Sequence, residues 1–261
     1  SSSSAASDVY KRQELDSYIG LATVKEEVRN LINMASVYKL RRQHDLPTTD
    51  MSLHMVFTGN PGTGKTMMAR MMARIYRSLD ILSKGQLVEV DRSGLVAGYV
   101  GQTAIKTQKV IQKALGGVLF IDEAYALNGK SENDFGQEAI DTILKAMEDH
   151  RDDLVVIVAG YTDLMDRFIH SDPGLESRFN RFLLFEDYTS DEMLDIFKMQ
   201  CKKGCYQLSD GVEELVRDYI TEENGDPETF GNARGVRNIF EHILVAQNNC
   251  LLYTSPSPRD A

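Results

Sequence analysis

The chain of 261 residues has no tryptophan, only three cysteines and only six prolines. It also lacks an uninterrupted apolar run of about 18 residues, the length that a membrane-spanning helix requires, so we expect no membrane association. No secretory pattern is visible near its beginning. Cys201 and Cys205 have no second Cys or His pair at metal-ligand spacing. These absences predict a cytoplasmic protein with reduced thiols.

Basic residues are outnumbered. The chain has 29 Lys and Arg against 39 Asp and Glu, which gives a net charge of −10. This balance argues against a broad nucleic-acid surface and leaves only a local basic patch open.

Residues 1–13 and 250–261 are serine-rich or break off a helical pattern, and they resemble translated vector sequence. We therefore expect non-native tails on a fragment that is cut at both sides.

One glycine-rich segment carries the strongest signal. It fits the pattern G-x-x-x-x-G-K-[ST] and consists of Gly59, Asn60, Pro61, Gly62, Thr63, Gly64, Lys65 and Thr66. An apolar stretch at 53–58 precedes it, and a stretch rich in helix formers follows at 67–74. A glycine loop between a strand and a helix turns backbone N–H groups toward phosphates. The sequence therefore predicts an ATP site, with Lys65 on the β- and γ-phosphates and Thr66 on Mg²⁺.

Two acids end another apolar stretch, Phe120-Ile121-Asp122-Glu123. At the carboxyl edge of a parallel sheet they would lie beside the phosphate loop. We predict that Asp122 binds Mg²⁺ together with Thr66, and that Glu123 is the general base for an attacking water. The alternative is that both acids merely end a strand and meet solvent.

Strand-like and helical patterns alternate through the first 188 residues and then only helical patterns follow. The expected strands are 53–58, 87–91, 117–123, 154–160 and 182–185, and the expected C-terminal helices are 190–201, 210–222 and 232–248. This order predicts an α/β doubly wound parallel sheet followed by a small all-helical domain. We place the two domains at 14–188 and 189–249.

The loop at 59–66, the strand end at 120–123 and the helical C-terminal part together resemble an AAA+ ATPase, a P-loop NTPase domain with a helical lid. Three segments, Tyr99–Ala104, Gly116–Tyr125 and Pro173–Phe179, are similar to the branch that holds red-type Rubisco activases and stage V sporulation protein K. The resemblance covers nearly all of the chain between its tails.

This resemblance implies roles for further residues. In AAA+ rings an arginine at the position of Arg178 reaches the γ-phosphate bound by a neighbouring subunit, with Arg181 as the second candidate. Arg234 matches the lid arginine that reads the nucleotide of its own subunit. Ile19 and Gly20 would line the nucleotide, and a homo-hexamer is implied. The plain alternative is a set of solvated surface arginines.

The segment Tyr99-Val100-Gly101 matches the aromatic–hydrophobic–glycine loop that lines the pore of ring remodellers. It implies a protein client that is pulled or threaded through the ring, although an exposed tyrosine could equally be a packing anchor.

At the end of the fourth strand many relatives carry a polar residue that orients the water. Here the chain reads Ala159-Gly160-Tyr161-Thr162, so the orienting residue stays open, with Tyr161 and Thr162 as the candidates.

The function that we predict is an ATP-hydrolysing module that remodels a protein partner through a ring pore. One alternative is a DNA-handling AAA+ protein such as a helicase or loader, against which the acidic balance and Tyr99 argue. The other alternative is a nucleotide-binding scaffold without hydrolysis, against which Glu123 and Arg178 argue. The sequence does not identify the client.

Overall fold

A computed structural model describes residues 2–49, 51–129 and 134–253. The chain divides into two compact units. The first unit runs to Gly59 and continues from Gly64 to Glu186, and the second contains Asn60–Thr63 and the chain from Asp187 onward. Four residues of the phosphate loop therefore group with the C-terminal unit. Within the described ranges, no helix is both long enough and apolar enough to cross a membrane.

The first unit is built on a five-stranded parallel sheet with the order β2-β3-β4-β1-β5. The strands are β1 (Met55–Thr58), β2 (Leu87–Val90), β3 (Val118–Asp122), β4 (Val155–Gly160) and β5 (Phe182–Leu184). Each lies within a segment where the sequence predicted a strand, and the doubly wound parallel sheet is confirmed. The strand that feeds the phosphate loop, β1, lies between β4 and β5.

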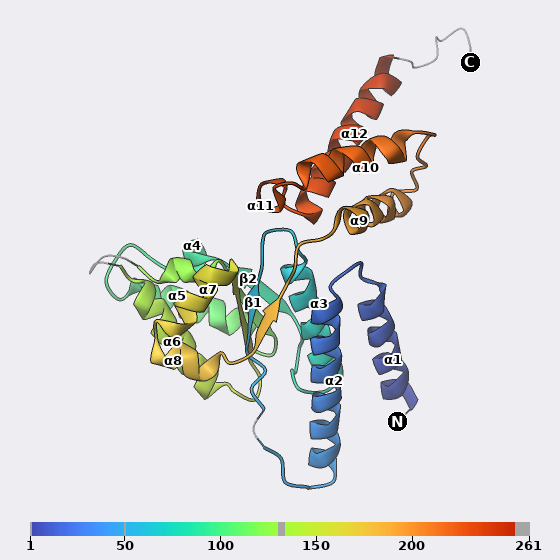
Figure 1. The fold of residues 1–261 in the computed structure, drawn as a ribbon. Coiled ribbons are helices and arrows are strands. Elements are labelled where there is room, and N and C mark those ends of the chain that lie inside the picture. Colours follow the sequence, from blue (N-terminus) through green and yellow to red (C-terminus); the bar gives the residue numbers. More distant parts are fainter. Residues whose placement is uncertain (1, 50, 130–133, 254–261) are drawn as a thin grey trace. The chain divides into compact units, whose positions relative to one another are not determined.

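Helices cover both faces of this sheet (Figure 1). In chain order they are α1 (Ser2–Ser17), α2 (Ala22–Gln43), α3 (Lys65–Ser78), α4 (Arg92–Leu95), α5 (Gln102–Ala114), the 3₁₀ helix η1 (Ala124–Leu127), α6 (Gly136–Asp149), α7 (Thr162–His170) and α8 (Pro173–Arg178). The first three pack on one face and those from α5 to α8 on the other. The sheet is thus covered on both sides, as its parallel strands require.

Alternate residues of the central strands β1, β3 and β4 enter different cores. In β3, Val118 and Phe120 belong to the core under α1–α3, whereas Leu119 and Ile121 belong to the core under α5–α8. Because successive side chains of a strand point to opposite faces, a strand buried on both faces must be apolar at every position. This explains why the sequence shows continuous apolar runs.

The structure describes most of the predicted N-terminal tail, but only the beginning of the predicted C-terminal tail. Helix α1 runs through the residues assigned to the N-terminal tail, and the Lys11 Nζ donates a hydrogen bond to the Arg74 carbonyl oxygen at 3.0 Å. Leaving out residues 1–13 therefore removed a helix from the predicted fold. At the other end, residues 254–261 of the predicted tail lie outside the described residues.

The C-terminal unit is helical, as the sequence predicted. Its helices are α9 (Ser190–Lys203), α10 (Val212–Glu223), α11 (Pro227–Phe230) and α12 (Ala233–Tyr253). Helix α9 begins at a capping box, in which Thr189 and Glu192 satisfy each other's backbone N–H groups. The Phe240 ring of α12 meets Phe197 of α9 edge-on, with ring centres 6.2 Å apart. The short helix α11 was not predicted.

His54, just before β1, is hydrogen-bonded to the backbone of β4. The backbone N–H of Val156 donates to the Nδ1 of His54 at 2.9 Å, so this ring nitrogen must be unprotonated. Burial, and after it the charge of Arg178, lowers the pKa of His54 to about 4. The fold therefore needs the neutral imidazole.

We expect this histidine to make stability fall in mild acid. The pKa of His54 is lower in the folded chain than in the unfolded chain. Its contribution to the free energy of unfolding is therefore complete above the unfolded pKa of about 6.5 and is lost as the pH falls toward 4. His54→Asn keeps an acceptor near the Nδ1 position and does not titrate. Urea denaturation of both proteins should show the wild-type advantage at pH 7 shrinking by up to about 3 kcal/mol at pH 4. A constant difference between the two proteins would contradict this role.

Candidate functional site

The phosphate loop connects β1 to α3 and depends on its glycines. Gly59, Gly62 and Gly64 have φ values of 146°, 73° and 93°, a region that other residues rarely adopt. A Cβ atom on Gly59 would lie 2.3 Å from the Phe185 carbonyl oxygen, and one on Gly62 would lie 2.0 Å from the Gly231 carbonyl oxygen. No side chain fits at either position, because backbone of another segment already occupies that space.

The beginning of α3 suits an anion. Gly64 precedes the helix and offers no side-chain cap, so no side-chain acceptor occupies the first helical N–H groups. Lys65 and Thr66 are the first two residues of the helix, and both are half-buried. The Lys65 Nζ donates to the Gly59 carbonyl oxygen at 2.8 Å and so points back across the loop. This donor set fits a polyphosphate with a bound Mg²⁺.

The two acids lie at the same sheet edge. Asp122 pairs with Ala159 of β4, whose other side pairs with Phe57, one residue before the end of β1. Asp122 is therefore level with the end of β1, from which the phosphate loop leaves, and one strand, β4, lies between them. Sequence reasoning predicted this arrangement, because the carboxyl ends of parallel strands share one edge.

Glu123 has an unusual backbone. Its φ is 48°, in the left-handed region that a non-glycine residue seldom occupies. Two hydrogen bonds keep it there: its N–H donates to the Asp122 Oδ1 at 3.0 Å, and its carbonyl oxygen accepts from the Ala126 N–H at 2.9 Å. Such strain concentrates at functional positions. It turns the chain sharply out of β3 and leaves Glu123 exposed.

A hollow of about 370 Å³ lies against the two acids. It is lined by Asp91, Arg92, Ser93, Val96, Asp122, Glu123 and Ala126. Arg92 is fixed there, because it donates to the Ala126 carbonyl oxygen at 2.7 Å and to the Asp134 carboxylate at 2.8 Å. Sequence reasoning missed Arg92, since nothing in the local pattern links it to residues more than 30 positions away.

Tyr125 also borders the acids and was not predicted as a site residue. A Cβ placed on Gly160 would lie 3.0 Å from a ring carbon of Tyr125. Burial raises the pKa of Tyr125, and the negative charges of Glu123 and Asp122 raise it further. The available signal was its position two residues after Glu123. The residues first considered for orienting the water, Tyr161 and Thr162, lie at the junction of β4 and α7.

In the second unit, the tip of the phosphate loop is clamped by side chains from the C-terminal part. Asn232 is 0% exposed, and its Oδ1 accepts from the Tyr188 N–H at 2.8 Å. Its Nδ2 donates to the Pro61 carbonyl oxygen at 3.3 Å and to the Asp187 carboxylate at 2.9 Å. The Asn60 Nδ2 donates to the same carboxylate at 3.0 Å.

Backbone contacts complete this clamp. The Ala233 N–H, at the beginning of α12, donates to the Gly62 carbonyl oxygen at 3.0 Å, and the Tyr188 hydroxyl donates to the Thr63 carbonyl oxygen at 3.4 Å. Sequence reasoning missed Asp187, Tyr188 and Asn232. The signal was weak: an asparagine after a glycine is typical of a left-handed turn, and Asn232 has a φ of 52°.

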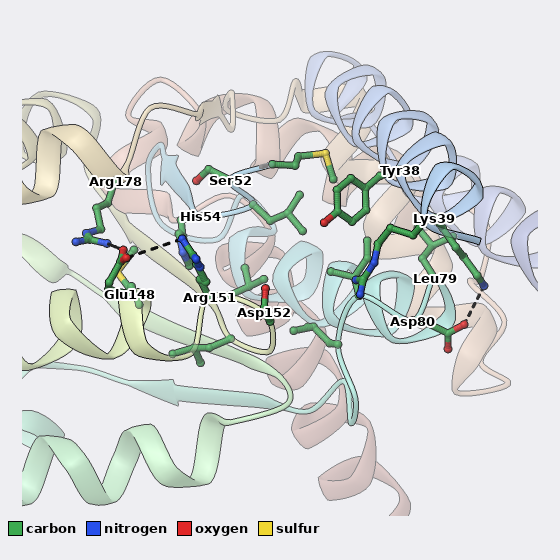
Figure 2. A pocket seen from close by; sticks show the side chains of 18 of the residues that line it. Tyr38, Lys39, Ser52, His54, Leu79, Asp80, Glu148, Arg151, Asp152 and Arg178 are labelled. Carbon is green, nitrogen blue, oxygen red and sulfur yellow. Dashed lines mark hydrogen bonds and ion pairs between the residues drawn. The ribbon is translucent and has the colours of Figure 1, made fainter. Parts of the chain in front are cut away.

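The predicted arginines lie apart from the loop. Arg178 lines a hollow of about 540 Å³ together with His54, Glu148 and Arg151, at the edge where β1 and β4 begin (Figure 2). Arg181 donates to the Ser52 carbonyl oxygen at 3.0 Å, near the same edge. The four residues of β1, at roughly 3.3 Å each, separate this edge from the loop that follows β1.

The remaining predicted residues are placed as follows. Arg234 is the second residue of α12 and is exposed. Ile19 and Gly20 form the turn between α1 and α2, and their assignment to the nucleotide stays a prediction. Tyr99 and Val100 are 77% and 84% exposed, between α4 and α5. The buried Thr103 hydroxyl accepts from the Ala97 N–H at 3.0 Å and anchors the base of that loop.

Comparison with known proteins gave consistent matches. The profile of the "ATPase family associated with various cellular activities (AAA)" matches residues 55–187, and an AAA lid domain profile matches residues 189–260. The chain is 46% identical over 237 residues to the chloroplastic ribulose bisphosphate carboxylase/oxygenase activase of Cyanidioschyzon merolae, covering 90% of this chain and 80% of that protein.

Two further relatives agree. Stage V sporulation protein K of Bacillus subtilis is 40% identical, with 92% of this chain and 75% of that protein covered. Protein CbbX of Cereibacter sphaeroides is 43% identical, with 95% and 81% covered. Among solved structures, a Thermotoga maritima RuvB mutant superposes with a TM-score of 0.59 at 21% identity. That match covers 87% of this chain and 63% of the solved chain, and it speaks for the fold alone.

We expect Asn232→Ala to destabilise the C-terminal unit by about 1–3 kcal/mol. The substitution leaves the N–H group of the buried Tyr188 without its acceptor and removes the hydrogen bond to the Asp187 carboxylate. It also places an alanine at a positive φ, so Asn232→Gly, which relieves that strain, should recover only part of the loss. Chemical denaturation measures both variants. Asn238→Ala, an exposed change on the same helix, is the control, and equal stability of all three variants would contradict the clamp.

Proposed function

The chain belongs to the AAA ATPase family, and on that premise we propose that it binds ATP with Mg²⁺ and hydrolyses it in a ring of identical subunits that remodels a protein. One observation carries the proposal. A complete phosphate loop and two consecutive carboxylates, Asp122 and Glu123, lie at the same edge of one parallel sheet. This is the edge at which parallel α/β sheets bind their ligands.

Each part of the site has a proposed task. The backbone N–H groups of the loop and the beginning of α3 would hold the phosphates, and Lys65 would exchange the Gly59 carbonyl oxygen for phosphate oxygens. Thr66 and Asp122 would hold Mg²⁺. When bound, the metal ion supplies positive charge that neutralises the phosphate oxygens.

Glu123 is proposed as the general base. Its carboxylate accepts a proton from the water that attacks the terminal phosphorus atom of ATP, while the departing ADP takes the electrons of the broken P–O bond. The hydrogen bonds of its N–H and carbonyl oxygen fix its backbone, so its side chain is presented from a defined point at the strand end. Tyr125 and Arg92 shape the surroundings of that carboxylate.

Arg178 is proposed to act on the nucleotide of a neighbouring subunit. Its place at the edge where β1 begins, away from the loop of its own subunit, supports action between subunits. Arg181 stays the second candidate, and its Nε donates to the Ser52 carbonyl oxygen. Arg234, exposed at the beginning of α12, is proposed as the lid arginine of the same subunit.

The exposed loop at Tyr99 supports a protein client. A large aromatic and a valine stand in solvent on a loop whose base is anchored by Thr103. Gly98 and Gly101 have open space around them, so the tip is not packed against neighbouring residues. Because one relative is named as an activase of ribulose bisphosphate carboxylase/oxygenase and another for sporulation, we propose only that the client is a protein.

We expect Glu123→Gln to stop turnover and keep binding. Loss of the base should lower kcat by at least about 100-fold, while the affinity for a fluorescent ATP analogue stays within about threefold. Lys65→Ala should instead lose the binding itself. Glu26→Gln, an exposed change on α2, is the control. Turnover of Glu123→Gln close to that of the control would remove the proposed base.

We expect Tyr99→Ala to leave basal ATP hydrolysis intact and to abolish its stimulation by an unfolded polypeptide such as casein. The ring face, rather than the hydroxyl group, would grip the chain, so Tyr99→Phe should retain the stimulation. Hydrolysis assays with and without casein measure both effects. If Tyr99→Ala lowers basal hydrolysis or the melting temperature, Tyr99 is a packing residue.

A further inference from the structure

The arginine proposed to act between subunits is bound by a carboxylate of its own subunit. Arg178 ends α8, and its Nη1 donates to the Glu148 Oε2 at 2.9 Å (Figure 2). The other oxygen of Glu148 lies 3.9 Å from the Nη1 of Arg151. The Glu148 carboxylate thus lies between two arginines, one residue before the end of α6.

The position of Glu148 is not explained by its helix. Helix α6 ends with Glu148 and Asp149 and has no basic residue in its last turn. A negative charge at the C-terminal end of a helix opposes the helix dipole. The favourable partner comes instead from α8, because the Arg178 hydrogen bond, and after it the Arg178 charge, lowers the pKa of Glu148. Glu148 is therefore an anion at neutral pH.

The guanidinium of Arg178 has few other restraints. Its Nε is buried, and among the described residues it has no hydrogen-bond partner. Its side chain is 31% exposed and borders a hollow of about 540 Å³. The arginine therefore has space to turn away from the surface of the subunit. The bond to Glu148 is the contact that gives its planar group a direction.

We propose that Glu148 is a positioning residue, which holds the Arg178 guanidinium in the orientation that presents it to the nucleotide of a neighbouring subunit. The inference rests on the function proposed for Arg178. Glu148 accepts from Nη1, which leaves Nη2 for phosphate oxygens, since an arginine can donate to two acceptors at once.

The pair contributes little to folding. Both side chains are partly exposed, at 31% and 57%, and ion pairs in such positions add little stability. A structural role and a positioning role therefore predict different results. Loss of a structural contact would lower the melting temperature, whereas loss of the positioning contact would lower kcat and leave the melting temperature unchanged.

The test compares Glu148→Ala and Glu148→Gln with Asp149→Ala, which removes the neighbouring exposed carboxylate. Because Glu148 would act on the chemical step, kcat for ATP in Glu148→Ala should fall about tenfold or more, with KM within about twofold. Glu148→Gln keeps an acceptor and should fall between Glu148→Ala and wild type. Asp149→Ala should match wild type, and all melting temperatures should agree within about 2 °C.

A second arm separates Glu148 from Arg178. If Glu148 acts only through Arg178, adding Glu148→Ala to Arg178→Ala should cause no further loss of kcat. In mixed rings, Glu148→Ala subunits should regain turnover beside Lys65→Ala subunits, which supply an intact Arg178 and Glu148. Recovery in this mixture supports the inference.

Three results overturn the inference. The first is a wild-type kcat in Glu148→Ala while Arg178→Ala is inactive. This result would reject the positioning role of Glu148 and leave the function proposed for Arg178 intact. The second is a loss of kcat that comes with a lower melting temperature, which makes the contact structural. The third is a further loss when Glu148→Ala is added to Arg178→Ala. Wild-type kcat in Arg178→Ala is a separate failure, because it rejects the function proposed for the arginine itself.

Discussion

The left-handed backbone of the glycines between β1 and α3 is the constraint on which the rest of the first unit depends. Gly59 can approach the Phe185 carbonyl oxygen only because it has no Cβ. That approach requires β5 beside β1, and β1 must be buried on both faces to carry the loop rigidly. The two cores, the strand order and the helix that begins at Lys65 all serve to present one short stretch of backbone.

The two edges of the sheet then carry different chemistry. At the edge where the strands end, Asp122 and Glu123 follow β3 as the phosphate loop follows β1, and Glu123 adopts a strained backbone. At the edge where the strands begin, His54 is kept neutral by burial, and Arg178 and Glu148 form a partly exposed ion pair. On the proposed function, one subunit would bind the phosphates at one edge of its sheet and offer Arg178 to the phosphates of a neighbouring subunit at the other. This separation would then be the physical reason for a ring.

Much of this could be predicted from the sequence. The strands were recognisable because parallel strands buried on both faces are continuously apolar, and the loop because only glycine tolerates its backbone. The parallel order then placed Asp122 at the sheet edge from which the loop leaves β1, without further information. Short elements such as α4 and η1 span too few residues to show a period, and they were missed. The contacts of Asn60 with Asp187 and of Arg178 with Glu148 join residues 127 and 30 positions apart. Each depends on where two elements meet in space, which no local pattern records.

The clamp at the loop tip has a consequence for recombination between relatives. Residues Asn60–Thr63 belong to the same compact unit as the chain from Asp187 onward, although they lie far apart in the sequence. A chimera that exchanges the lid at a single crossover near residue 187 would pair a loop tip from one parent with an Asn232 turn from the other. The unit that can be exchanged intact is discontinuous and consists of the lid together with four residues of the phosphate loop.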